Sequence, residues 1–380
     1  MIEVQDIFNT YGAAYRSTRK LSKVQYKAMS AIENCRTAKL GGHVDICDEC
    51  GYTQNSYNSC RNRHCPKCQT LAKERWIDNQ KYDLLNVGYF HVVLTIPSEL
   101  NSIVIQNQKV MYNILFKAAA ETLTELASDK KYLGAKIGFT CILHTWGQNL
   151  MHHPHVHCIV PGGGLNSIGQ WVNSRKKFFL PVKVLSRKFR GKFLHYLKQA
   201  ELKFYGNQKR YETDNAFQIF LNILYDKEWI VYCKAPFKDA ISVVEYLGRY
   251  THRVAISNNR ILNIKDGNVS FKWRDYKDNN KWKVMTLTAD EFIRRFLIHI
   301  LPQRFIKIRH YGFLGNRNKN TKLKICKQLT NTPILLKEKT PTLELIKTLI
   351  GRDITLCPKC KSNKFNRYPG ISPPNIATAT

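Results

Sequence analysis

Acidic side chains are scarce in this chain of 380 residues. It carries 28 Asp and Glu against 60 Lys and Arg, which gives a formal net charge of +32 at pH 7. So large an excess of positive side chains causes them to repel one another unless a polyanion binds. The excess therefore predicts nucleic acid as the partner. An ordinary basic protein from a lysine-rich proteome is the alternative. An anionic membrane surface is less favoured, because no basic amphipathic helix stands alone in the sequence.

Long apolar runs and internal repeats are missing as well. No stretch approaches the roughly 20 apolar residues of a membrane-spanning helix, and the N-terminus lacks the basic-then-apolar pattern of a signal peptide. We therefore expect a cytosolic protein without a membrane partner. Because 43% of the residues are hydrophobic, the chain can bury a sizeable core in more than one domain.

The helix-like and strand-like segments favour an α+β fold, since they mix without strict βαβ alternation. The sequence after residue 253 alternates short apolar strands with the turn signals NN, DGN and DNN, and we expect these hairpins to extend the main sheet. The Pro- and Thr-rich tail YPGISPPNIATAT is expected to be disordered. We divide the chain into a helical and zinc-binding domain at 1–86, a central domain at 87–320 and a basic C-terminal region at 321–380.

The twelve cysteines include three C-x2-C pairs. In a reducing compartment such pairs hold zinc more often than they form disulfides. The remaining cysteines within apolar, strand-like runs are interpreted as small buried hydrophobic residues. These are Cys141, Cys158 and Cys233.

Two of the C-x2-C pairs predict a structural zinc site in the N-terminal region. Each pair bends its own turn so that two thiolates converge, and two such turns complete a tetrahedral site. The predicted ligands are Cys47, Cys50, Cys65 and Cys68, and one could be exchanged for a neighbour among Cys35, His43, Cys60 and His64. The third pair, Cys357 and Cys360, forms either a half-site with Cys326 or simply a turn.

Basic residues lie on the predicted zinc knuckle and in a later segment rich in aromatic side chains. Arg61 and Arg63 suit contact with DNA phosphates, although a solvated basic face is the alternative. In FKWRDYKDNNKWK, bases of an unpaired strand could stack on the rings while basic side chains follow the phosphates. We select Lys272, Trp273 and Arg274 there, with exposed edge-strand residues as the alternative.

Histidines gather in HHPHVHC, at residues 152–158. On a strand, His155 and His157 point to one face while Val156 enters the core. Two imidazoles on one face can bind a metal, although satisfied structural histidines are the commoner use of such a pair. Gln148 is the predicted third ligand, through its carbonyl oxygen, and His144 is the alternative donor.

Tyr246 and Tyr250 are four residues apart in EYLGRYTHR, so a helix would present both phenols on one face. A tyrosine stripe that packs on the sheet is the alternative. Arg249 and Arg253 crowd the same segment, where a plain packing helix has little need of them.

Together, HPHVHC with IVPGGGL, the Y-x3-Y helix, the HVVLTIP strand and the SCRNRHCPKCQ knuckle resemble the zinc-domain-bearing, two-tyrosine transposases of rolling-circle insertion sequences. These belong to the HUH (His-hydrophobic-His) endonuclease superfamily. The resemblance extends from about Gly42 to Asn318 and weakens beyond Thr321. It implies an antiparallel palm sheet with packed helices, with the histidine pair on a central strand and the tyrosine helix across the metal.

The resemblance also implies a catalytic role for the central domain, namely nicking and joining of single-stranded DNA at element ends and target DNA through a covalent 5′-phosphotyrosine. Tyr246 and Tyr250 are then the nucleophiles and His155, His157 and Gln148 the metal ligands. Arg249 and Arg253 are candidates to help the phenol ionise or to neutralise the phosphate. The family indicates Mg²⁺ or Mn²⁺ at this site and structural Zn²⁺ at the cysteines, whereas imidazole ligands alone would suit zinc.

Other functions remain open at this point. A zinc-finger DNA-binding protein without catalysis would use the same histidines and tyrosines structurally. A metal-dependent phosphoesterase would attack with water and form no covalent adduct. A plasmid-type rolling-circle replication initiator would share the mechanism and differ in its DNA target.

Overall fold

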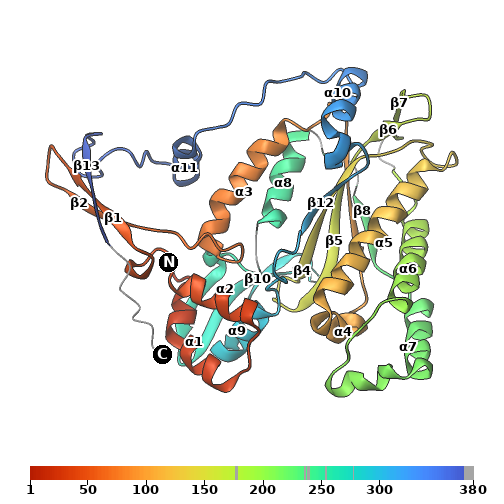
Figure 1. Cartoon of the computed structure of the whole chain (residues 1–380), viewed down its shortest axis with the longest axis horizontal. Helices are drawn as coiled ribbons and strands as arrows, with labels where there is room; N and C mark the ends of the chain where they lie inside the picture. The colour runs from red at the N-terminus through yellow and green to blue at the C-terminus, as the bar shows by residue number, and fades with distance from the viewer. Residues whose placement is uncertain (176–178, 235–236, 238–239, 253–254, 277, 372–380) are drawn as a thin grey trace.

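A five-stranded antiparallel sheet forms the centre of the structure, a computed structural model that describes residues 1–175, 179–234, 237, 240–252, 255–276 and 278–371 (Figure 1). Its strand order is β12-β4-β5-β3-β8. The strands are β3 (Tyr89–Thr95), β4 (Phe139–Trp146), β5 (His152–Pro161), β8 (Val231–Lys234) and β12 (Ile308–Tyr311). Helices pack on this sheet, so the expected α+β class with an antiparallel palm and the histidine pair on its central strand is confirmed.

One face of the palm sheet is buried in the main hydrophobic core. Alternate residues such as Val92, Leu94 and Val156 are fully buried there, as the period of two requires. Helices cover this face with fully buried leucine and phenylalanine side chains such as Leu115 and Phe189. They are α4 (Asn101–Gln106), α5 (Gln108–Ser128), α6 (Val182–Lys198) and α7 (Asp214–Asp226).

The opposite face of the palm sheet carries the histidines and is covered by two helices. These are α3 (Pro66–Lys81) and α8 (Ala240–Thr251), which lie side by side (Figure 1). A small apolar cluster joins Val243 of α8 to Ile142 and Ile159 of the sheet, and the half-buried Trp76 of α3 packs against it. This cluster holds α8 over the sheet beside the histidines.

The N-terminal helices share a second core with a separate three-stranded sheet. Helices α1 (Val4–Thr18) and α2 (Lys23–Glu33) pack with α9 (Ala289–Leu297), and the rings of Phe8 and Phe296 meet edge to face at 5.4 Å. The sheet has the order β11-β10-β9 and consists of β9 (Ile261–Lys265), β10 (Asn268–Asp275) and β11 (Lys281–Thr288).

The expectation that the hairpins after residue 253 extend the main sheet is therefore wrong. The edges of the palm are β12 and β8, and neither pairs with β9 or β11. The apolar face of the hairpins, including Val269 and Phe271, packs instead against α1 and α9. Local turn signals predict a hairpin, but they do not say which partner buries it.

Another three-stranded sheet pairs a hairpin near the N-terminus with a strand near the C-terminus. Its order is β13-β1-β2, with β1 (Gly42–Cys47), β2 (Thr53–Tyr57) and β13 (Phe365–Ile371). The connection from the palm to β13 passes through α10 (Lys319–Leu329) and α11 (Thr342–Ile350). Elsewhere in the chain, a separate short hairpin pairs β6 (Gly163–Leu165) with β7 (Trp171–Asn173).

The expected disorder of the tail is wrong for its first four residues, Tyr368 to Ile371, which belong to β13. Backbone pairing with β1 orders them, and sequence composition does not reveal so distant a partner. The rest of the tail lies outside the described residues. The domain divisions at residues 87 and 321 remain predictions. None of the described helices is long and apolar enough to cross a membrane.

The contact between Phe8 and Phe296 gives a test of the second core. We expect Phe8→Ala to lower the free energy of unfolding by about 3–5 kcal/mol, because it leaves a cavity beneath α1. Urea unfolding followed by tryptophan fluorescence measures the change. Ile168→Ala, at a side chain that is 74% exposed, is the control and should change stability by less than about 0.5 kcal/mol. An equally small effect of Phe8→Ala would contradict this packing.

Candidate active site and metal clusters

The register of the palm sheet brings three histidines together. His144 of β4 pairs directly with His155 of β5, and His157 follows two residues later on the same face. Directly opposed residues of an antiparallel pair point to the same face, so all three side chains lie on the side away from the main core. All three are buried, whereas Val156 between the pair lies in the main core.

The ring nitrogens of this histidine cluster converge on one point. The Nε2 atom of His155 lies 3.1 Å from Nε2 of His157 and 3.1 Å from Nδ1 of His144. The Nδ1–H of His155 donates to the His153 carbonyl at 2.6 Å, which leaves its Nε2 lone pair turned toward the other two rings. Metal–nitrogen bonds of about 2.0–2.1 Å place ligand nitrogens roughly 3 Å apart, as they are here.

Burial keeps these imidazoles neutral. It lowers the pKa of His155 to about 3 and the pKa values of His144 and His157 well below the ordinary range, and neighbouring histidines add to the shift. The neutral imidazole is the form that binds a metal. In charge state and geometry, the residues present therefore fit a divalent metal ion.

The third histidine of this cluster is His144, whereas the side chain of Gln148, the predicted third ligand, has a different partner in this structure. A bulge separates His144 from Trp146, so the strand alternation does not carry on to residue 148. The Gln148 side chain instead donates from Nε2 to the Tyr276 hydroxyl at 2.9 Å. His144 is the alternative donor that the sequence had offered.

His91 of β3 joins the metal ligands to the tyrosine helix. Its Nε2 lies 2.8 Å from Nδ1 of His157, and its ring meets the Tyr246 ring edge to face at 5.2 Å. Burial lowers the pKa of His91 to about 4, so it too is neutral. A hydrogen-bond partner on the second ring nitrogen fixes the orientation of a metal-ligating histidine. His91 is not among the residues predicted from the sequence, although its alternation with Val93 and Thr95 on a buried strand could have indicated the shared face.

Tyr246 is the candidate nucleophile whose side chain the structure describes. It is half-buried between His91 and Phe237. Two residues later, Gly248 lets α8 approach α3, since a Cβ there would lie 2.3 Å from the Ile77 side chain. The side chains of Arg249 and Tyr250, although in α8, lie outside the described part of the structure, and so does Arg253 altogether.

The predicted DNA-contact residues differ in their exposure. Arg61, Lys272 and Arg274 are exposed, and Trp273 is half-buried against the second core. Arg63 is directed inward, because it donates to the Phe305 carbonyl at 2.6 Å. Its position indicates a structural contact, and its role in DNA binding remains a prediction.

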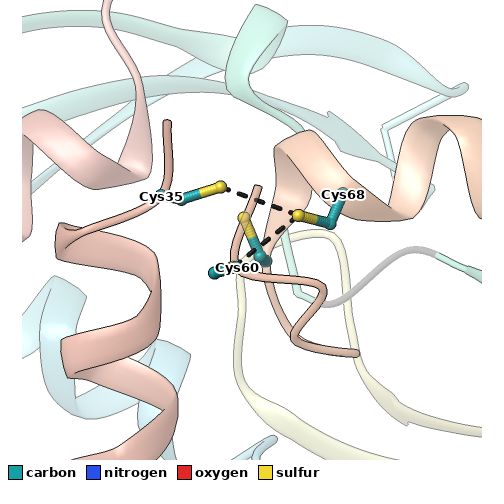
Figure 2. A group of neighbouring side chains, drawn as sticks. Cys35, Cys60 and Cys68 are labelled. Atoms are coloured by element: carbon teal, nitrogen blue, oxygen red, sulfur yellow. Dashed lines mark hydrogen bonds between the residues drawn. The ribbon is translucent and has the colours of Figure 1, made fainter. Parts of the chain in front are cut away.

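Four cysteines converge at the base of the β1–β2 hairpin. Cys35 precedes the hairpin and Cys60 follows it, while Cys65 and Cys68 begin α3. Figure 2 shows Cys35 and Cys60 directed at Cys68, whose sulfur lies 3.6 Å from each of theirs. A four-cysteine set is typical of a closed structural zinc site. Contact with the Cys60 thiol lowers the pKa of Cys35 to about 7.

The predicted set of Cys47, Cys50, Cys65 and Cys68 is therefore wrong, because the structure places its two halves in different clusters. Cys47 and Cys50 lie at the tip of the hairpin. At about 3.3 Å per residue, the length of β1 places this tip about 20 Å from the base of the hairpin. There they meet Cys357 and Cys360 instead. Cys326, the suggested partner of the last pair, lies in a separate apolar cluster. His64 is no zinc ligand either, since its Nε2 accepts from the Leu301 amide at 3.1 Å.

Comparisons with known proteins identify the family. The Y2_Tnp family, described as "Putative transposase", matches residues 138–322, and Zn_Tnp_IS91, a "Transposase zinc-binding domain", matches residues 7–96. The protein named "Putative transposase y4qJ" of Sinorhizobium fredii is 49% identical over 373 residues, which cover 96% of this chain and 94% of the relative. The chain belongs to the IS91 family of insertion-sequence transposases. The resemblance seen in the sequence is thereby confirmed.

A second relative lies further away. The transposase for insertion sequence element IS801 of Pseudomonas savastanoi pv. phaseolicola is 27% identical over 303 residues, covering 78% of this chain and 72% of the relative. Among solved structures, a conjugative relaxase, TrwC, in a copper-bound complex with oriT DNA shares 10% identity at a TM-score of 0.24. That match covers 42% of this chain and 68% of the relaxase, and a likeness so low supports no argument.

This IS91-family transposase allows a direct test of the third metal ligand. We expect His144→Ala to weaken Mn²⁺ binding by more than about 100-fold, since loss of a direct ligand exceeds the 10- to 100-fold cost of losing an outer partner. Gln148→Ala should leave the affinity unchanged. Calorimetric titration measures both, and His152→Ala removes an equally buried histidine outside the cluster as a control. The opposite ranking would restore Gln148 as the ligand.

The cysteines at the hairpin base allow a second test. We expect Cys60→Ser to release about one zinc ion per chain, because a closed site of four thiolates then loses one. Elemental analysis of the purified protein measures the zinc content. Cys233→Ser, at a half-buried cysteine outside both clusters, should keep the full content. Retention of all zinc in Cys60→Ser would exclude this cluster as the zinc site.

Proposed function

We propose that this transposase nicks single-stranded DNA at the ends of its insertion sequence and transfers strands through a covalent 5′-phosphotyrosine in the cytoplasm. The observation that carries the proposal is the contact between the rings of Tyr246 and His91. The Nε2 atom of His91 is also hydrogen-bonded to Nδ1 of His157 in the buried histidine cluster. A candidate nucleophile and a candidate metal site thus lie one side chain apart. A tyrosine that merely packs on a sheet has no need of such a neighbour.

The histidine cluster supports a metal-assisted reaction. A divalent ion held by His144, His155 and His157 would withdraw charge from the scissile phosphate and orient it for in-line attack. Mg²⁺ or Mn²⁺ is the proposed ion, with phosphate oxygens as the further ligands. The three-imidazole set is softer than the oxygen sites that Mg²⁺ prefers, so we rank Mn²⁺ first.

The tyrosine supplies the nucleophile. An unperturbed phenol has a pKa of about 10, so it must lose its proton as it attacks. The phenolic oxygen bonds to phosphorus, the bond from phosphorus to the 3′ oxygen breaks, and that oxygen takes up a proton to become a free 3′-OH. The phosphotyrosine ester conserves the energy of the broken bond. Attack by a 3′-OH on this ester then joins the strands and restores the tyrosine without ATP.

A basic and aromatic hairpin beside the histidines supports the choice of single-stranded DNA. Strands β10 and β11 pair Arg274 with Trp282, which is 62% exposed, and Tyr276 is 60% exposed at the end of β10. The Tyr276 hydroxyl accepts from Gln148 in the turn between β4 and β5, which ties the hairpin to the end of the strands that carry the cluster. Exposed rings stack with unpaired bases, while Arg and Lys follow the phosphates.

A labelled DNA strand from the ends of the element tests the proposal. After incubation with Mn²⁺ or Mg²⁺, a denaturing gel should show a DNA-linked band of protein size. We expect the band to vanish in Tyr246→Phe plus Tyr250→Phe and in His157→Ala, because the first removes both nucleophilic oxygens and the second a metal ligand. Tyr232→Phe, at an exposed tyrosine of the edge strand β8, is the matched control and should keep the band.

Other outcomes would replace the proposal. Cleavage without a protein-linked species would indicate a phosphoesterase that attacks with water. Binding without cleavage, unaffected by loss of both tyrosines, would indicate a DNA-binding protein in which the histidines and tyrosines are structural.

A further inference from the structure

We propose that Cys47, Cys50, Cys357 and Cys360 bind a second zinc ion, which fastens the C-terminal end of the chain to the N-terminal hairpin. Their four sulfur atoms lie within 4.8 Å of one another. The Sγ atoms of Cys47 and Cys360 are 3.5 Å apart, and those of Cys50 and Cys357 are 3.6 Å apart. Zinc–sulfur bonds of about 2.3 Å in a tetrahedron require sulfur separations of about 3.8 Å.

The backbone around the two cysteine pairs gives independent support. In each pair the residue after the second cysteine returns its amide to the carbonyl of the first, from Gly51 to Cys47 and from Lys361 to Cys357, at 2.9 Å in both. Gly51 and Lys361 both adopt the left-handed conformation, with φ of +67° and +64°. Two turns of the same shape thus face each other, and each directs two thiols to the same point.

The left-handed conformation at Lys361 strengthens this inference. A residue with a Cβ rarely adopts it, and the cost must be met by surrounding structure. The conformation makes the second turn match the first, which has glycine at the corresponding position. If the two turns held no common ligand, there would be no physical reason for Lys361 to adopt the same strained conformation as Gly51.

The sulfur distances do not fit disulfide bonds, which require about 2.05 Å. Burial differs along the set, since Cys47 and Cys357 are buried while Cys50 is half-buried and Cys360 exposed. The site therefore lies at the surface of the small sheet. This position lets a zinc ion enter once the two turns have met.

Polar contacts flank the four cysteines and align the two turns. Lys364 pairs with Glu49 at 2.8 Å, and Arg367 pairs with Asp45 at 2.8 Å. The Asn366 side chain donates to Asp48 at 2.7 Å. Positive charges on β13 and on the residue before it therefore match negative charges on the hairpin, and β13 pairs with β1 from His43 to Cys47 in one register.

The segment that leads to this site has few other anchors. We call residues 330–371 the C-terminal arm, which crosses from α10 past α11 to β13 (Figure 1). Helix α11 buries none of its residues, and Leu336 is 85% exposed. Three hydrogen bonds tie the arm to α3 and the residues after it: Arg75 donates to Thr342 at 2.5 Å, Tyr82 to the Glu338 carbonyl at 2.8 Å, and the Asn86 amide to Thr332 at 2.7 Å. With so little apolar burial along the arm, a metal at its end would add to the backbone pairing of β13 with β1 in ordering it.

Zinc content of the full-length protein tests this site. We expect about two zinc ions per chain, one for each set of four cysteines. Cys357→Ser with Cys360→Ser should leave about one, and Cys47→Ser with Cys50→Ser should leave the same, because the two pairs share one ion. Cys326→Ser, at a buried cysteine outside both sets, should keep both ions.

Two further measurements separate loss of the ion from misfolding. In cobalt-loaded protein, the thiolate absorption of the set containing Cys60 should persist in both paired variants. Hydrogen exchange should accelerate in β13 and β1 while the palm stays protected. Unchanged zinc content in either paired variant would overturn the proposal, as would a mass spectrum that shows a disulfide among these four cysteines. None of these readouts depends on DNA cleavage.

Discussion

The register between β4 and β5 controls the candidate active site. It sets His144 against His155, and strand alternation then places His157 beside them and Val156 in the main core. A slip of one residue would exchange the two faces, turning buried imidazoles into the apolar core and valine toward the tyrosine helix. The large core beneath the sheet, packed by α4 to α7, therefore fixes the register and with it the convergence of the ring nitrogens. Stability and chemistry depend here on the same alternation.

The cysteines at the hairpin base are linked to this site through two helices. Cys65 and Cys68 hold the beginning of α3, and Ile77 of the same helix lies against Gly248 of α8. Helix α8 in turn carries Tyr246 to His91. The zinc-binding domain thus supports the helix that carries Tyr246. The second core adds to this support, because it joins α1 and α2 to residues more than 250 positions later.

The sequence predicted those features that local periodicity determines. The apolar run HVVLTIP located β3, and the H-x-H alternation gave the face of His155 and His157, whereas the basic segment that forms the edge strand β12 was not predicted as a strand. Features that depend on distant partners were predicted wrongly. The C-x2-C spacing identified ligand pairs but could not assign them, because Cys47 and Cys65 are close in sequence and separated by the length of a hairpin. The bulge after His144 is likewise invisible in the spacing that favoured Gln148. For Tyr250, Arg249 and Arg253, the family resemblance remains the basis of the prediction.

The pairing of β13 with β1 has a consequence for synthesis on the ribosome. Cys50 and Cys357 are 307 residues apart, so at about 5–20 residues per second the hairpin waits roughly 15–60 s for its third strand. During that time β1 presents an open edge, which can pair with another chain. A product released before residue 365 would keep this edge open permanently. Completion of the small sheet thus distinguishes finished chains from truncated ones.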